Sequence, residues 1–114
     1  MSADCLFCKI INGQIPAKVV HQDELTLGFL DISPQAPTHV LFIPRRHIAT
    51  LNDASPDDRD LLGHLVLVAA KYAREKGVEG GYRQVINCNR DGGQTVFHVH
   101  LHLLGGRPMT WPPG

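Results

Sequence analysis

The segment His98–Leu104 constrains the fold more than any other part of the chain, because three histidines alternate in it with apolar residues. Such alternation is typical of a strand with one buried face, so the imidazoles are expected on one side and Val99, Leu101 and Leu103 on the other. Neighbouring histidines of a strand lie about 6.5 Å apart and the outer two about 13 Å apart. A zinc ion holds nitrogen ligands at about 2.0–2.1 Å. One metal can therefore take two adjacent histidines but not all three, which leaves at least one imidazole for acid–base or nucleophilic chemistry.

The remaining local signals predict an α+β fold. A short helix is expected over residues 5–12 with Asp4 as its N-cap, and a long helix from the capping residue Ser55 to Gly77. Strands are expected over residues 18–21, 25–30, 38–43, 82–87 and 96–104. The order of these elements and their short connections favour a five-stranded antiparallel sheet with the helices on one face.

Composition excludes several classes of function. The chain has 114 residues with 11 basic and 11 acidic side chains, which fits a single domain over residues 1–114 and gives no footprint for nucleic acid or a membrane surface. No apolar stretch approaches the roughly 20 residues that span a bilayer, and the first residues lack the pattern of a signal peptide. Three cysteines in such a chain indicate a reducing compartment, so we expect a cytoplasmic protein.

Two segments outside the histidine row indicate a nucleotide. Main-chain N–H groups around Gly92 and Gly93 are suited to binding an anion, with the Thr95 hydroxyl as a further donor, although Asp-Gly is equally typical of a hairpin turn. Phosphorus is an electrophile that suits a histidine nucleophile. Phe29 could flank a base and the carboxylate of Asp31 could accept both ribose hydroxyls, although Asp-x-Ser-Pro is also a turn signal.

The sequence resembles the histidine triad (HIT) superfamily. His98–Leu104 matches its pattern of three histidines with apolar spacers, and three further segments are similar to the HINT branch of nucleoside phosphoramidases: residues 31–39, residues 91–95 and the ending 105–114. The match runs without gaps from about Cys5 to Gly114, and the ending separates the chain from the dinucleoside-polyphosphate hydrolase branch. The resemblance implies a homodimer whose two five-stranded sheets join into one of ten strands. Residues 105–114 would form a tail at the dimer interface, with Trp111 reaching towards the partner's site.

The resemblance also implies a role for each residue of the site. His100 would attack the α-phosphorus to give a nucleotidyl-histidine that water resolves, His102 would bond the phosphate oxygens, and His39 would assist proton transfer to the leaving amine. The phosphate would be surrounded by Asn87, Gly93, Gln94 and Thr95, where the family commonly has serine at the last position. The purine pocket would be walled by Phe7, Ile10, Ile15, Phe29 and Ile32, with Asp31 on the ribose.

Zinc is the point at which this sequence departs from many members of the HINT branch. Other members of the superfamily hold zinc with a cysteine pair, a histidine beyond the Ile-Pro-basic end of a strand, and the first histidine of the triad. The matching positions here are Cys5, Cys8, His47 and His98, a set that makes a closed tetrahedral site. The alternative is that both cysteines are buried small apolar residues. We expect structural zinc, with no metal required for the chemistry.

These observations predict a purine nucleoside phosphoramidase that acts on AMP–amine conjugates and binds purine nucleoside monophosphates. A nucleotide-binding adaptor with vestigial hydrolysis is an alternative, which would bind AMP without turning over a phosphoramidate. A third hypothesis is a metallohydrolase whose zinc is held by the histidine row. Chelation would abolish the activity of such an enzyme quickly, whereas loss of a structural zinc lowers stability first.

Overall fold

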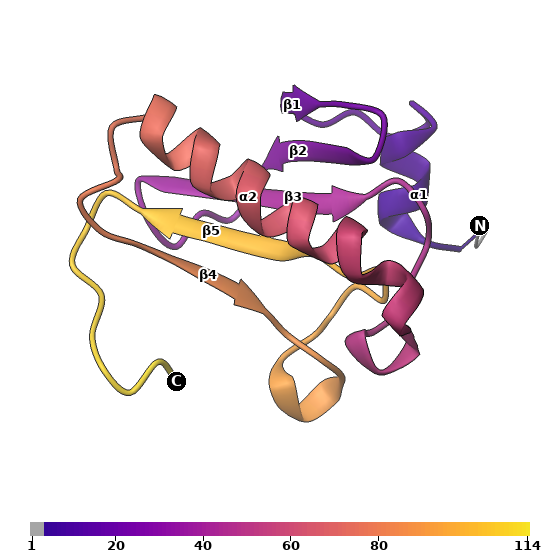
Figure 1. Cartoon of the computed structure of the whole chain (residues 1–114). Coiled ribbons are helices and arrows are strands. Elements are labelled where there is room, and N and C mark those ends of the chain that lie inside the picture. Colours follow the sequence, from indigo (N-terminus) through magenta and orange to yellow (C-terminus); the bar gives the residue numbers. More distant parts are fainter. Residues whose placement is uncertain (1–3) are drawn as a thin grey trace.

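The computed structural model describes residues 4–114; residues 1–3, part of the stretch in which no signal peptide is expected, lie outside the described residues. Its centre is a five-stranded antiparallel sheet with the strand order β1-β2-β3-β5-β4 (Figure 1). The strands are β1 (Val19–Gln22), β2 (Thr26–Leu30), β3 (Thr38–Pro44), β4 (Tyr82–Ile86) and β5 (Leu101–Gly105). The predicted α+β class is confirmed. Within residues 4–114, no helix is both long and apolar enough to cross a bilayer.

The long helix α2 (Arg59–Glu75) begins and ends where local signals place it. Ser55 caps a 3₁₀ turn, Pro56–Asp58, that runs directly into the helix, and the Asp58 carboxylate accepts a hydrogen bond from the Ser55 main-chain N–H. Gly77 follows the helix with φ of +74°, a conformation that glycine adopts without steric cost. The capping residues therefore determine both ends of the long helix.

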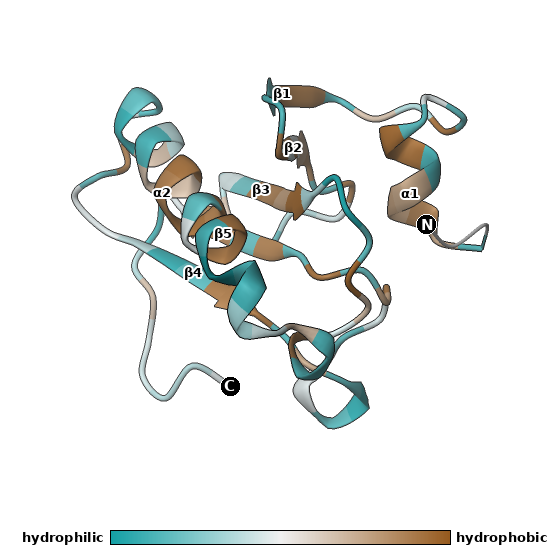
Figure 2. Ribbon diagram, turned by 45° about the vertical axis from the view of Figure 1, so that its right-hand side comes forward, coloured by the Kyte–Doolittle hydropathy of each residue, from teal (hydrophilic) through white to brown (hydrophobic). Residues whose placement is uncertain are grey.

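The two helices lie on opposite faces of the sheet, so the expectation that both cover one face is wrong (Figure 1). Val40 and Phe42 of β3 pack with α2, whereas the alternating Leu41 and Ile43 pack on the side of the short helix α1 (Leu6–Ile11). Successive side chains of a strand point to opposite faces, and every residue of β3 after the first is buried, so this strand must be covered twice. In Figure 2, α2 carries both brown and teal stretches, as an amphipathic helix does.

The last strand is shorter than predicted, because β5 begins at Leu101 and residues 96–100 precede it. Val99 precedes Leu101, the first paired residue of β5. Its main-chain N–H donates at 2.7 Å to the oxygen of Ile48, which follows β3 in the chain. The predicted alternation of faces nevertheless continues through this irregular segment. The residues buried on the α2 side are Val99, Leu101 and Leu103, while His98 and His100 are buried and contact Phe7 of α1 on the other.

The short helix α1 is capped by Cys5 rather than by the predicted Asp4. The Cys5 sulfur accepts a hydrogen bond from the main-chain N–H of Cys8 at 3.3 Å. This cap fixes the position of the first turn, and Phe7 and Cys8 are buried against the sheet as a result. α1 and its N-cap therefore supply an aromatic ring, Phe7, and two sulfurs, those of Cys5 and Cys8, to the side of the sheet where His98 and His100 lie.

Candidate active site and metal centre

The environment of His100 leaves a lone pair on its Nε2. The ring is 5 % exposed, and its Nδ1 lies 2.8 Å from the main-chain oxygen of His98. A carbonyl oxygen only accepts hydrogen bonds, so Nδ1 carries the proton and Nε2 keeps its lone pair. Phe7 packs its edge against the ring at a centroid distance of 5.1 Å and restricts its rotation. The ring is thus held in one tautomer and one orientation.

A chain of hydrogen bonds holds His102 in the tautomer opposite to that of His100, with the proton on Nε2. The main-chain N–H of Gln35 donates to Nδ1 of His39 at 3.0 Å, so the proton of the neutral His39 ring is on Nε2. That Nε2 lies 3.0 Å from Nδ1 of His102, which must then accept. The proton of His102 is therefore on Nε2. Side by side, at a ring-centroid distance of 4.9 Å, His100 offers a lone pair and His102 offers a donor.

Burial keeps these imidazoles neutral. It lowers the pKa of His100 and His39 below the ordinary value of 6.5, and this effect outweighs the carboxylate of Asp31, which acts in the opposite direction. Burial also lowers the pKa of His102 to about 4, with repulsion from His100 and His39 adding to it. Neutral imidazole is the form that acts as a nucleophile or general base.

His100 and His102 line an apolar cavity of about 830 Å³. Its volume lies within the range of small-molecule sites. Phe7 and Phe29 form one wall with their rings edge to face at 5.4 Å. Nine residues of the predicted nucleotide site line the cavity: Phe7, Ile10, Ile15, Phe29, Asp31, Ile32, Thr95, His100 and His102. The lining is mostly apolar, and His100 and His102 are among its few polar side chains.

Asp31 forms the turn that its sequence context predicts and also lines the cavity. Its Oδ1 accepts a hydrogen bond from the main-chain N–H of Ser33 at 2.7 Å, as the turn signal predicts. Its Oδ2 lies 3.4 Å from Nε2 of His39, and the residue also lines the cavity. The turn thus fixes a carboxylate at the edge of the cavity.

The loop before the triad does not form the predicted anion nest. The main-chain N–H groups of Gly92, Gly93 and Gln94 donate to carbonyl oxygens of Asn89 and Arg90, within the loop itself. The Gln94 side chain is buried and likewise bonds main-chain atoms. Of the four residues expected around the phosphate, only Thr95 lines the cavity; the others are Asn87, Gly93 and Gln94. The main-chain donors of Gly92, Gly93 and Gln94 are therefore used within the loop.

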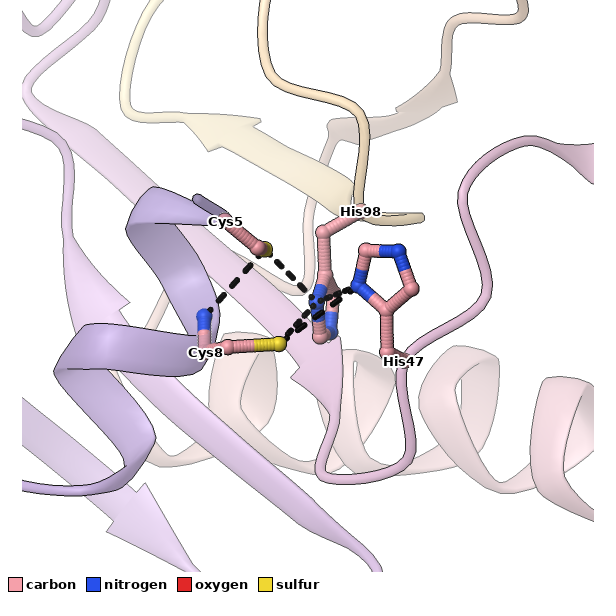
Figure 3. A group of neighbouring side chains, drawn as sticks. All are labelled: Cys5, Cys8, His47 and His98. Carbon is pink, nitrogen blue, oxygen red and sulfur yellow. Dashed lines mark hydrogen bonds between the residues drawn. The ribbon is translucent and has the colours of Figure 1, made fainter. Parts of the chain in front are cut away.

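Cys5, Cys8, His47 and His98 converge on one point (Figure 3). Their sulfur and Nδ1 atoms all lie within 4.8 Å of one another. The sulfur–nitrogen distances are 3.3 to 3.6 Å and the two Nδ1 atoms are 3.2 Å apart. Zinc binds sulfur at about 2.3 Å and nitrogen at about 2.05 Å. In a tetrahedral site these bond lengths place a sulfur and a nitrogen ligand roughly 3.5 Å apart and two nitrogen ligands roughly 3.3 Å apart. The donor set fits zinc in both chemistry and spacing.

The tautomer of His98 also fits a metal. Its Nε2 lies 2.7 Å from the main-chain oxygen of Pro44, so the proton is on Nε2 and Nδ1 keeps a lone pair for a metal. Burial lowers the pKa of His98 to about 4, which keeps the ring neutral. Asp31, His39 and His102 also bring ligand atoms together, but there Nε2 of His39 carries a proton and is not a ligand. Of the histidine row, only His98 faces the cysteine pair.

Comparison with known proteins identifies the family. Residues 12–109 match the model of the HIT domain. The chain belongs to the HIT family. A HIT family hydrolase from Legionella pneumophila is 58 % identical, with a TM-score of 0.95 over 97 % of this chain and all of that one. The purine nucleoside phosphoramidase of Escherichia coli K12 is 52 % identical over 110 residues, which are 96 % of this chain and 92 % of that protein.

A third relative bears on the metal centre. A zinc-bound histidine triad family protein from Mycobacterium smegmatis is 37 % identical, with a TM-score of 0.80 over 91 % of this chain and 76 % of that one. Zinc therefore occurs in a HIT protein of similar fold, which agrees with the spacing of the four side chains here.

Sequence reasoning missed part of this HIT site. Seven residues that line the cavity were not predicted: Leu6, Pro16, Ala17, Lys18, Leu30, Leu41 and Val96. Most of them adjoin a predicted residue in the sequence, so the pattern marked the right segments but not their full contact surface. The main-chain N–H of Gln35 has no signal of its own in the sequence, because any residue other than proline supplies one.

Proposed function

We propose that this HIT protein is a purine nucleoside phosphoramidase that forms a covalent nucleotidyl-histidine at His100. The observation that carries the proposal is the hydrogen bond from His100 Nδ1 to the oxygen of His98, because it leaves the Nε2 lone pair beside the cavity. The similarity to the Escherichia coli enzyme over nearly the whole chain supports the choice of substrate. The apolar cavity suits the purine, and Asp31 lies where it can accept the ribose hydroxyls.

The first step forms a bond between His100 Nε2 and phosphorus and breaks the P–N bond. The N–H of His102 stabilises a phosphoryl oxygen, and the Thr95 hydroxyl adds a second donor at the edge of the cavity. The leaving amine takes up a proton from solvent as it departs, and phosphorylated His100, which keeps its proton on Nδ1, becomes an imidazolium. His39 does not line the cavity and keeps its own proton on Nε2, so it assists by holding His102 as a donor towards the substrate. Water then attacks phosphorus, the bond between phosphorus and His100 Nε2 breaks, and the water gives its proton to solvent as the monophosphate leaves, with both rings neutral again.

A rapid-quench experiment with adenosine phosphoramidate labelled in the phosphate tests the mechanism. A labelled nucleotidyl adduct should appear on His100 before free AMP accumulates, and His100→Ala should abolish both. His102→Ala should slow adduct formation without preventing it. Full activity in His100→Ala would refute the assignment. Tight binding of AMP without any turnover would instead favour the nucleotide-binding adaptor.

We further propose that Cys5, Cys8, His47 and His98 hold a structural zinc ion. When bound, the metal would tie α1 to the segment before β5 and so stabilise the wall of the cavity. Its ligands take no part in the steps above, since only His98 is shared with the triad. Elemental analysis of protein purified without added metal should find close to one zinc per chain; its absence would refute this proposal.

The chain is also proposed to form a homodimer with the tail 105–114 at its interface. β4 is an edge strand of the sheet, and its partly exposed residues are free to pair with a second copy. Trp111 is 82 % exposed, an unusual position for a large aromatic ring. Light scattering after size exclusion should give twice the mass of the chain, and Trp111→Ala should weaken the dimer or its activity.

A further inference from the structure

The segment after β5 packs against the loop that leads to His39. Gly105 at the end of β5 is paired with Thr38 at the start of β3, so the tail leaves the sheet beside this loop (Figure 1). A Cβ on Gly106 would lie 2.9 Å from Cβ of Pro37, and the glycine has φ of +91°. Contact this close leaves no room for a side chain at position 106. The tail and the loop therefore meet at a fixed distance.

Arg107 joins the two segments by hydrogen bonds. Its Nε donates to the main-chain oxygen of Gln35 at 3.0 Å, and its Nη1 donates to the oxygen of Pro108 at 3.1 Å. Within residues 4–114 it makes no ion pair with a carboxylate. Arg107 is exposed, yet its Nε and Nη1 both donate to main-chain carbonyls, one in the loop and one in the tail.

Gln35 connects this contact to the triad. Its carbonyl accepts from Arg107, while its N–H donates to Nδ1 of His39. That N–H determines the tautomer of His39, because a proton on Nδ1 would face another donor. The tautomer of His39 in turn determines that of His102. A side chain in the tail is thus two hydrogen bonds away from the histidine pair.

We propose that Arg107 is a positioning residue for this reaction: it holds the main chain of Gln35 so that the His39–His102 pair keeps the Nε2–H tautomer. The inference rests on the proposed function, since it concerns the step in which His102 donates to the substrate. Loss of the Arg107 hydrogen bond frees the Gln35–Ala36 peptide, whose oxygen Arg107 holds, and so loosens the adjoining Pro34–Gln35 peptide, whose N–H donates to His39 Nδ1. His39 then samples the Nδ1–H tautomer, and His102 loses its donor towards the cavity in the same fraction of molecules.

Two substitutions of similar length separate the hydrogen bond from the rest of the side chain. Arg107→Gln places an amide nitrogen at the same number of bonds from the main chain as Nε, so it keeps a donor and loses the charge. Arg107→Met places a methyl group there and has no donor. We expect kcat to fall by about threefold or more in Arg107→Met with little change in KM, and to stay within about twofold of the parent in Arg107→Gln.

Nitrogen-15 NMR of the imidazoles gives a readout that does not depend on turnover. In the parent protein, His39 and His102 should both show the Nε2–H tautomer. Arg107→Met should shift both towards a mixture, and Arg107→Gln should not. Arg83→Met is the matched control, because Arg83 donates to the tail oxygen of Thr110 at 2.8 Å but does not contact the loop; its imidazole signals should match the parent.

Parent-like tautomers and kcat in Arg107→Met would overturn the inference, as would equal loss in Arg107→Gln, which would assign the effect to charge. A shift of the same size in Arg83→Met would also overturn it, because any loosening of the tail would then suffice. If the parent protein forms no adduct on His100, the proposed function fails. The NMR comparison still decides whether Arg107 sets the tautomers.

Discussion

Nδ1 of His100 lies 2.8 Å from the main-chain oxygen of His98, so the residue that faces the metal centre also orients the proposed nucleophile. The side chain of His98 turns away to Cys5 and Cys8, while its carbonyl fixes the tautomer of the next histidine in the row. In the proposed function the row is thus divided: one ring binds the metal, one attacks phosphorus and one donates to the phosphate.

Activity is expected to persist in mild acid. A lowered histidine pKa means that the neutral form survives as the pH falls below the ordinary value of 6.5, and burial lowers the pKa of all three reacting imidazoles. The plot of kcat/KM against pH reports groups of the free enzyme. Its acidic limb should therefore lie below pH 6.5.

Asp31→Asn provides the check on this pH profile. The carboxylate raises the pKa of His39, His100 and His102 against the effect of burial, so its removal should move the acidic limb to still lower pH. The level of kcat/KM is expected to drop because the proposed ribose contact is lost, so the position of the acidic limb, and not the level, is the result that tests the effect of Asp31 on the histidine pKa values. A limb centred near 6.5 in the parent protein would show that burial does not hold these rings neutral.

Loss of the metal should lower stability before it lowers activity. Cys8→Ser removes one of four ligands and should reduce the bound zinc, with a fall in Tm of ~10 °C or more. Molecules that remain folded should still form the adduct, because no step uses the metal. Cys88→Ser is the matched control, since Cys88 lies outside the ligand cluster. Rapid loss of turnover on chelation, with Tm unchanged, would instead indicate a metallohydrolase.

Local patterns predicted much of this fold, and most of the errors involve distant contacts; the cap of α1, at Cys5 and not at Asp4, is a local exception. Ser55 and Pro56 begin the long helix because capping needs only neighbouring residues. The alternation in the histidine row correctly assigned Val99 and His98 to opposite faces. The start of β5 was wrong because the main chain of Val99 bonds Ile48, about fifty positions away, instead of continuing a ladder.

In the site, too, some groups could be predicted from the sequence and others could not. The histidines, the cysteine pair and the apolar wall could be predicted, because their side-chain types indicate the chemistry. Main-chain donors could not, because residue identity does not show which N–H groups are used. The N–H groups of Gly92 and Gly93 looked available in the sequence but are used inside the loop, and the N–H of Gln35 proved decisive. Only the folded chain brings Arg107 to Gln35.

Ile32 should affect substrate binding without affecting stability. Its side chain is 98 % exposed and lines the cavity, so it gains cover only when a ligand is present. Removing about 40–60 Å² of apolar contact corresponds to about 1–1.5 kcal/mol, so Ile32→Ala should raise KM about five- to tenfold with kcat unchanged. Leu25→Ala is the control, because Leu25 is 48 % exposed and does not line the cavity. An unchanged KM in Ile32→Ala would place the purine elsewhere.

Asp23 is expected to stabilise the fold without serving the reaction. One of its oxygens lies 2.7 Å from Nε2 of His21 in β1 and 2.9 Å from Nε2 of His64 in α2, and the other accepts two main-chain N–H groups of the turn. Burial raises the pKa of Asp23, but these hydrogen bonds outweigh it and hold the pKa well below 3.8. The ionised carboxylate therefore ties the edge strand to the helix on the face opposite the cavity.

Asp23→Asn tests this tie by urea unfolding. Replacing a charged acceptor should lower the free energy of unfolding by about 2 kcal/mol at pH 7, with turnover unchanged at temperatures where both proteins are folded. A lowered carboxyl pKa stabilises the fold above the unfolded value of 3.8 and loses that effect as the pH falls towards the folded value. The difference between the two proteins should thus be constant near neutral pH and shrink below about 4. A difference that stays unchanged into acid would mean that shape, and not charge, makes Asp23 stabilising.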